Sequence, residues 1–173
     1  MPIERPPRDP AAAEDLLNAA EKFRDTFTLN ELTAAPVRHI VVLACMDARL
    51  DLFRLLGLEI GDAHILRNAG GRVTDDMIRS LLLSSHALGT REVVVIHHTG
   101  CGLHGQSNDE LRSRVHDGSG GDAGHIDFLP FEDVQASVRF DVERIRACTL
   151  LPPDMAAWGA VYDVSDGSLT RVA

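Results

Sequence analysis

Two apolar runs constrain the fold of this chain more than any other feature. Residues 40–44 read Ile-Val-Val-Leu-Ala, and residues 92–97 read Glu-Val-Val-Val-Ile-His. Such runs, with no polar residue at alternate positions, are typical of parallel strands that are buried on both faces. Helical apolar spacing follows each run. The sequence therefore predicts an α/β fold: a mostly parallel central sheet of about four strands plus an edge strand, helices on both faces, and an N-terminal helical arm.

The remaining elements follow from local signals. Strands are predicted over residues 63–66 and 156–164, and Asp166-Gly167 predicts a hairpin turn into a last strand over residues 168–172. Helices are predicted over residues 50–56, from Thr74 to Gly89, and from residue 131 to 145. Residues 105–124 are rich in Gly, Ser, Asp and Asn, which predicts a mobile stretch with one helical turn around residues 109–115.

The length of 173 residues accommodates one hydrophobic core but not two. Prolines at positions 2, 6, 7 and 10 predict that residues 1–10 form a disordered or loosely docked arm. Residues 11–173 are predicted to form a single domain. A helix is expected from Ala11, with an apolar stripe at Leu16, Ala20, Phe23 and Phe27.

Charge and composition exclude several classes of function. The formal net charge is −9, and the basic residues are scattered along the chain, so we expect no nucleic-acid partner. The N-terminus lacks the apolar core of a signal peptide, and no segment approaches 18 uninterrupted apolar residues, so we expect no membrane partner and a cytoplasmic protein. In that reducing compartment the three cysteines are not expected to form disulfides, so at least two of them call for another role.

Metal binding is that role for two of the cysteines. Cys45 follows the first apolar run, and His98 and Cys101 follow the second. The carboxyl ends of parallel strands gather at one edge of a sheet, so these side chains are expected to meet and to bind one Zn²⁺ per chain. Three protein ligands leave the fourth position open, as in catalytic zinc sites. Asp47 and Arg49 beside the first thiol also indicate a catalytic site, because a structural zinc site would have a fourth soft ligand in place of an acid and its counter-ion.

Taken one at a time, some of these residues could have an ordinary packing role. Free cysteine is among the most buried residue types, so Cys45 or Cys101 alone could be an ordinary core residue, but their joint position at two strand ends favours ligation. Cys148 continues a helical apolar face after Ile145 and is predicted to be core. His97 is expected to point away from the metal because side chains alternate along a strand.

The segments ACMDARLD, RNAGG and HHTGCG together resemble the β-class carbonic anhydrases, especially the short bacterial members. The resemblance runs from about residue 38 to residue 103. It implies zinc held by Cys45, His98 and Cys101, and a dyad of Asp47 and Arg49. The implied reaction is reversible hydration of CO₂ to bicarbonate and a proton by a zinc-bound hydroxide.

The resemblance has further implications. The Gly102 backbone amide would bind bicarbonate, and two chains would form a homodimer in which each N-terminal helix reaches over its neighbour, with a dimer of dimers as the alternative. Gly100 departs from the family pattern, because many relatives carry a polar or charged residue there.

Three other functions are compatible with the motifs. Relatives on the same scaffold hydrolyse carbonyl sulfide or carbon disulfide, and pocket width and polarity, which motifs do not encode, would select among these substrates. A non-catalytic zinc or anion-binding module would be marked by loss of Asp47 or Arg49, and both are present. A redox role for Cys45 and Cys101 lacks the usual C-x-x-C spacing.

Overall fold

A computed structural model of the chain describes residues 12–173. The predicted arm, residues 1–10, lies outside the described residues. Contacts divide the chain at residue 33, so residues 12–33 and residues 34–173 are described separately. The prediction of one domain over residues 11–173 stays a prediction.

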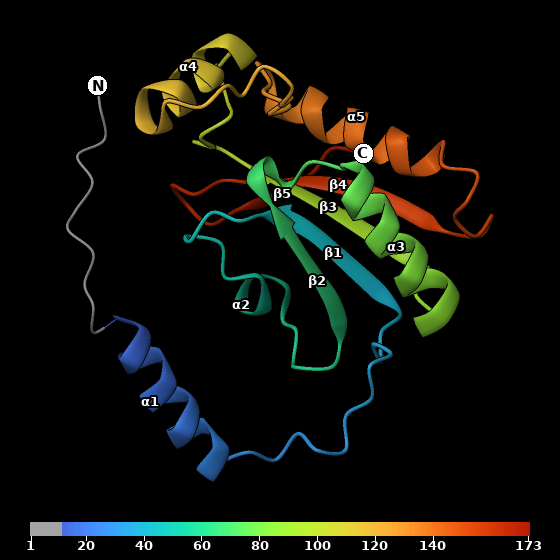
Figure 1. Ribbon diagram of the computed structural model, residues 1–173. Helices are drawn as coiled ribbons and strands as arrows, with labels where there is room; N and C mark the ends of the chain where they lie inside the picture. The colour runs from blue at the N-terminus through green and yellow to red at the C-terminus, as the bar shows by residue number, and fades with distance from the viewer. Residues whose placement is uncertain (1–11) are drawn as a thin grey trace. The chain divides into compact units, whose positions relative to one another are not determined.

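A five-stranded sheet forms the centre of residues 34–173 (Figure 1). Its strands are β1 (Ile40–Cys45), β2 (Ala63–Asn68), β3 (Glu92–His98), β4 (Ala156–Tyr162) and β5 (Leu169–Arg171). The spatial order is β2-β1-β3-β4-β5, with β5 antiparallel to β4 and all other neighbours parallel. The predicted α/β class, with four parallel strands and an edge strand, is confirmed.

Helices cover both faces of this sheet. The helices α3 (Asp75–Leu88) and α5 (Val134–Arg146) pack on one face, where Leu43, Val95 and Val138 are buried together. The short α2 (Leu52–Leu56) packs on the other face, against Val42 and Ile96. Because β1 and β3 are buried on both faces, they contain the two apolar runs.

Both ends of α3 agree with the helix predicted from Thr74 to Gly89. The Thr74 hydroxyl accepts a hydrogen bond from the Met77 N–H, and Gly89 ends the helix with a left-handed φ of 76°. The prediction of a single helical turn near residues 109–115 was wrong, because α4 (Asn108–Ser119) has 12 residues. Its start carries a capping box of Ser107 and Glu110, an S-x-x-E signal that outweighs the glycine-rich surroundings.

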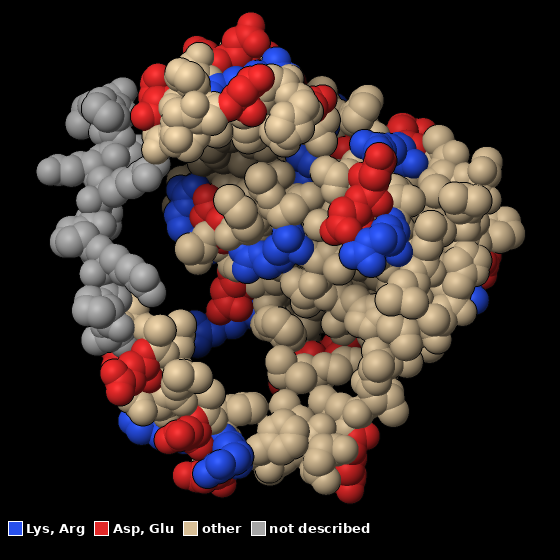
Figure 2. Space-filling model, in the orientation of Figure 1, with Lys and Arg blue, Asp and Glu red and all other residues tan. Residues whose placement is uncertain are grey.

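Residues 12–33 contain α1 (Ala12–Asp25), an amphipathic helix with no buried residue. Its apolar stripe is exposed: Leu16 is 74% accessible and Phe23 is 56% accessible. Between Ala12 and Ala173, none of the helices has both the length and the apolar character needed to cross a membrane. On the face seen in Figure 2, basic side chains are interspersed with acidic ones.

Candidate active site

Cys45, His98 and Cys101 lie together at the carboxyl edge of the sheet. Cys45 ends β1, His98 ends the neighbouring β3, and Cys101 follows in the turn. All three are at least nine-tenths buried, and their ligand atoms lie within 4.8 Å of one another. Sulfur and imidazole nitrogen at this separation match the donor set that Zn²⁺ prefers.

The His98 ring is oriented for ligation. Its Nδ1 lies 2.9 Å from the Thr99 carbonyl oxygen, which can only accept, so Nδ1 carries the proton and Nε2 is left with a lone pair. Nε2 is buried without a hydrogen-bond partner among residues 12–173. Burial lowers the pKa of His98, but the Cys45 sulfur and the Thr99 carbonyl raise it overall. A buried, unpaired nitrogen beside two sulfurs fits a metal ion.

The two thiols share a proton. The pKa of Cys45 is lowered to about 4, chiefly by the hydrogen bond from Cys101, while burial opposes the change. The same bond to the Cys45 thiolate raises the pKa of Cys101, and burial adds to that rise. The lowered pKa of Cys45 favours its thiolate form, and metal ligation by both sulfurs would also require release of the proton on Cys101.

Asp47 and Arg49 form a closed dyad beside these thiols. Arg49 Nη2 donates to Asp47 Oδ2 at 2.7 Å, and Arg49 Nε and its backbone N–H each donate to Oδ1 at 2.9 Å. These bonds hold the pKa of Asp47 well below its usual range. Asp47 Oδ2 lies 3.7 Å from His98 Nε2. The structure thus brings an ionised, fixed acceptor to the metal-ligand cluster.

Gly100, which lies between His98 and Cys101, holds Arg49 of the dyad in place. Its carbonyl oxygen accepts from Arg49 Nη2 at 3.0 Å, and its φ of 63° lies in the left-handed region that glycine adopts without strain. A carbon added there would meet Arg49 only at ordinary contact distance, 3.8 Å. Gly102 lies one residue after Cys101 and is exposed.

Arg67 lies in β2, one residue beyond the strand predicted over residues 63–66, and its contacts were not predicted. Its guanidinium donates to three carbonyl oxygens of the turn after β1: Cys45 at 2.9 Å, Asp47 at 2.6 Å and Leu50 at 3.2 Å. These bonds fix the turn that presents the dyad. The available signal was an arginine at a strand end, directly before the small residues of RNAGG.

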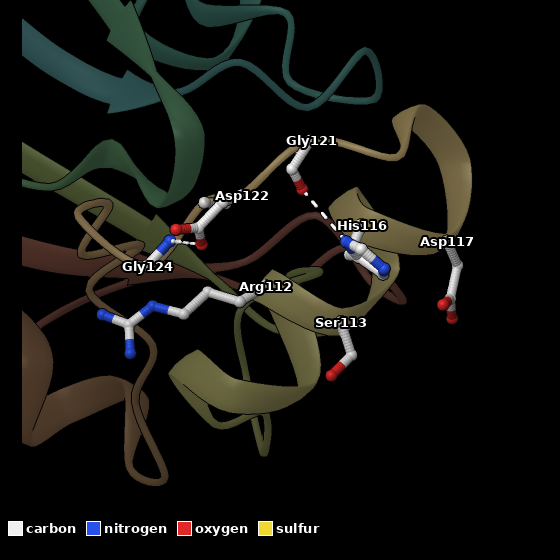
Figure 3. A pocket seen from close by; sticks show the side chains of 8 residues that line it. Arg112, Ser113, His116, Asp117, Gly121, Asp122 and Gly124 are labelled. Atoms are coloured by element: carbon white, nitrogen blue, oxygen red, sulfur yellow. Dashed lines mark hydrogen bonds between the residues drawn. The ribbon is translucent and has the colours of Figure 1, made fainter.

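The other histidines and Cys148 lie outside this cluster. His97 faces the opposite side of the sheet, where its Nε2 bonds the Gly71 carbonyl at 3.1 Å, in accord with strand alternation. Cys148 packs against the core beside Ile145, as predicted. A hollow of about 250 Å³ lies against α4 (Figure 3). His116, which bonds the Gly121 carbonyl, lines that hollow, and none of the predicted site residues does.

Comparison with known proteins agrees with this geometry. The carbonic anhydrase family profile matches residues 40–119. β-Carbonic anhydrase 1 of Mycobacterium tuberculosis is 40% identical over 143 residues, 82% of this chain and 86% of that protein. A carbon disulfide hydrolase of Acidithiobacillus thiooxidans is 34% identical over 152 residues, 76% of each chain.

Solved structures place the chain in the same group. A crystal structure of carbonic anhydrase from Streptococcus mutans superposes with a TM-score of 0.90 at 42% identity, covering 96% of this chain and all of that one. Sequence similarity and fold therefore agree over nearly the whole length. This chain belongs to the β-class carbonic anhydrases, zinc enzymes that interconvert carbon dioxide and bicarbonate.

Proposed function

We propose that Cys45, His98 and Cys101 hold the zinc ion, one per chain. The observation that carries this proposal is the buried His98 Nε2, which has no hydrogen-bond partner within residues 12–173 and lies in a cluster with two sulfurs. An apolar packing role would leave that nitrogen desolvated without compensation. A site of two thiolates and one imidazole leaves a coordination position for water.

Asp47, Arg49 and Gly102 supply the remaining chemistry in this proposal. Bound zinc activates a water molecule as a nucleophile near neutral pH. Asp47 is ionised and only accepts hydrogen bonds, so it would accept one from the O–H group of the attacking oxygen and orient that oxygen's lone pair toward CO₂. Arg49 keeps that carboxylate in one orientation through three hydrogen bonds. The exposed Gly102 N–H donates to a bicarbonate oxygen.

Carbon dioxide is the proposed substrate, in preference to carbonyl sulfide or carbon disulfide. The carbonic anhydrase of Mycobacterium tuberculosis is more similar, and over more of the chain, than the carbon disulfide hydrolase of Acidithiobacillus thiooxidans. A cytoplasmic location is part of the proposal, because Cys45, Cys101 and Cys148 are free thiols and a reducing compartment keeps ligand thiolates available.

Replacing the acceptor tests the assignment. We expect Asp47→Ala to retain zinc but to lower kcat for CO₂ hydration by roughly 100- to 1,000-fold, the size of effect seen when one group that stabilises a transition state is removed. Zinc content and turnover of CO₂, carbonyl sulfide and carbon disulfide would be measured side by side for this variant and the unmodified protein.

Asp62→Ala is the matched control for this test. Asp62 also pairs with an arginine, Arg38, but at the amino ends of β1 and β2, so its removal should leave turnover unchanged. Faster hydrolysis of carbon disulfide than hydration of CO₂ would identify the protein as a carbon disulfide hydrolase instead. Zinc-loaded protein with none of the three activities would contradict the enzyme assignment and favour a non-catalytic zinc or anion-binding module.

The proposed assembly is a homodimer that buries the apolar stripe of α1. Leu16, Leu17 and Phe23 are each more than half exposed in the single chain, an arrangement typical of an interaction surface. We expect a particle of twice 18.8 kDa, and Leu16→Glu together with Phe23→Glu should give monomers because two charges would enter the interface.

Light scattering coupled to size exclusion would report the masses. Asn18→Glu changes the opposite side of the same helix and should leave the dimer intact. A wild-type particle with four times the mass of one chain, which falls to twice that mass in the double variant, would indicate the dimer of dimers. A monomeric wild-type chain would contradict the proposed assembly.

A further inference from the structure

A buried cluster of Arg72, His97 and Asp141 lies next to the metal-ligand residues on the α5 side of the sheet. Their exposed fractions are 5%, 0% and 0%. Arg72 Nε donates to Asp141 Oδ2 at 2.7 Å, and His97 Nε2 lies 3.2 Å from the same oxygen. Arg72 Nη1 also donates to the Leu129 carbonyl at 2.6 Å. Leu129 has a left-handed φ of 55°, which is unusual for a branched residue, so this bond stabilises a strained segment before α5.

The cluster is charged. Burial would raise the pKa of Asp141, but the hydrogen bonds with His97 and Arg72 outweigh burial and hold that pKa below its ordinary value. His97 Nε2 carries a proton, because both of its neighbours, the Gly71 carbonyl and the carboxylate, are acceptors. Apolar residues of similar volume commonly replace such buried ion pairs without loss of stability, so fold stability alone does not account for the pair.

The cluster fixes the short 3₁₀ segment η1 (Ala69–Gly71) that follows β2. Arg72 directly follows η1, and its carbonyl accepts from Asn68 Nδ2 at 2.7 Å. His97 Nε2 donates to the Gly71 carbonyl at 3.1 Å. Both ends of η1 are therefore tied to the cluster or to its immediate neighbours.

The segment η1 in turn touches a metal-ligand residue. A carbon added at Gly71 would lie 2.9 Å from the Cys45 backbone nitrogen, so η1 and the end of β1 are in direct backbone contact. The Asn68 carbonyl, directly before η1, also accepts from the N–H of Met46, the residue after Cys45, at 2.8 Å. Contacts of this kind hold a metal-ligand residue in place.

Phe131 connects the same cluster to the turn that carries Cys101. Its ring stacks on His97 with centroids 5.8 Å apart, and the Arg72 guanidinium lies 5.8 Å from the ring centroid. Its backbone N–H donates to the Leu103 carbonyl at 3.3 Å. In the same turn, the His104 N–H donates to the Cys101 carbonyl at 3.1 Å.

We propose that Arg72 and Asp141 are positioning residues for the metal site. Their buried ion pair holds η1 in place, and through η1 it fixes the backbone that carries Cys45. Through Phe131 the pair also steadies the turn that carries the second thiol. This inference rests on the proposed zinc ligands and goes beyond them, because neither Arg72 nor Asp141 contacts the ligand atoms.

The decisive variant combines Arg72→Met with Asp141→Leu. It removes both charges and roughly conserves volume, so it avoids the unpaired buried arginine that Asp141→Asn alone would leave. We expect a folded protein, judged by circular dichroism and thermal unfolding of the apo form, whose zinc affinity falls about 10- to 100-fold in chelator competition. In the cobalt-substituted protein the thiolate-to-metal charge-transfer bands should shift, which a purely structural role would not cause.

Arg144→Met with Asp75→Leu is the matched control. That ion pair also involves α5, which it joins to α3, but Asp75 is exposed and the pair touches neither η1 nor Phe131, so affinity and spectra should stay as in wild type. Wild-type zinc affinity and cobalt spectrum in the Arg72/Asp141 variant would overturn the inference while leaving the zinc assignment intact. A wild-type chain that binds no zinc would instead overturn the ligand assignment on which the inference rests.

Discussion

Cys101→Ser will give a folded chain that no longer retains zinc and no longer hydrates CO₂. A serine hydroxyl stays protonated at neutral pH, so the site would keep one thiolate and one imidazole, and metal ligands have to be deprotonated. Loss of groups that only orient metal ligands lowers affinity about 10- to 100-fold, so loss of a ligand itself should exceed about 100-fold. Metal analysis after dialysis, with CO₂ hydration measured on the same sample, checks both effects.

Cys148→Ser is the control for this substitution. Cys148 packs against the buried residues between the sheet and α5, whereas Cys101 lies in the core on the opposite face of the sheet. Within residues 12–173 Cys148 belongs to no group of metal ligands. It should retain zinc and activity with a modest loss of stability. Full zinc content in Cys101→Ser, or zinc loss in Cys148→Ser, would show that the ligand set is wrong.

The proximity of the three proposed zinc ligands could be predicted from sequence because each residue follows from a local pattern and one topological rule. Residues 40–44 and residues 93–96 are apolar at every position, which indicates buried parallel strands, and such strands end at the same edge of the sheet. Strand alternation then separated His97 from His98 correctly. Neither step needed knowledge of contacts between distant residues.

The supporting residues could not be placed in this way. Asp141 lies 69 positions after Arg72, and nothing in the helical pattern of α5 singles out a carboxylate that would face the core. Arg67 bonds carbonyl groups of a turn 17 to 22 positions earlier, and carbonyl groups leave no trace in a sequence. Their roles depend on how the segments pack, and a single sequence does not encode that packing locally.

Gly71→Ala is expected to destabilise the protein by roughly 2–5 kcal/mol, a large fraction of typical native stability. Gly71 has a left-handed φ of 68°, which costs an L-residue about 1–2 kcal/mol. Its added carbon would lie 2.9 Å from the Cys45 nitrogen and 3.0 Å from both the Ala44 carbonyl carbon and the Ile96 oxygen. Overpacking of this kind costs about 1–3 kcal/mol more, because backbone on two strands would have to move. Urea unfolding of the apo protein measures the effect.

Gly120→Ala separates the two causes. Gly120 has a similar φ of 71°, but an added carbon there would meet nothing within 4 Å, so only the conformational cost of about 1–2 kcal/mol applies. The difference between the two variants therefore measures how tightly η1 is packed against β1. Because that contact involves the backbone of Cys45, zinc affinity should fall in any folded fraction of Gly71→Ala and stay unchanged in Gly120→Ala. Equal losses of stability in the two variants would mean that η1 can move away from β1. The conclusion that η1 holds the backbone of Cys45 in place would then be wrong.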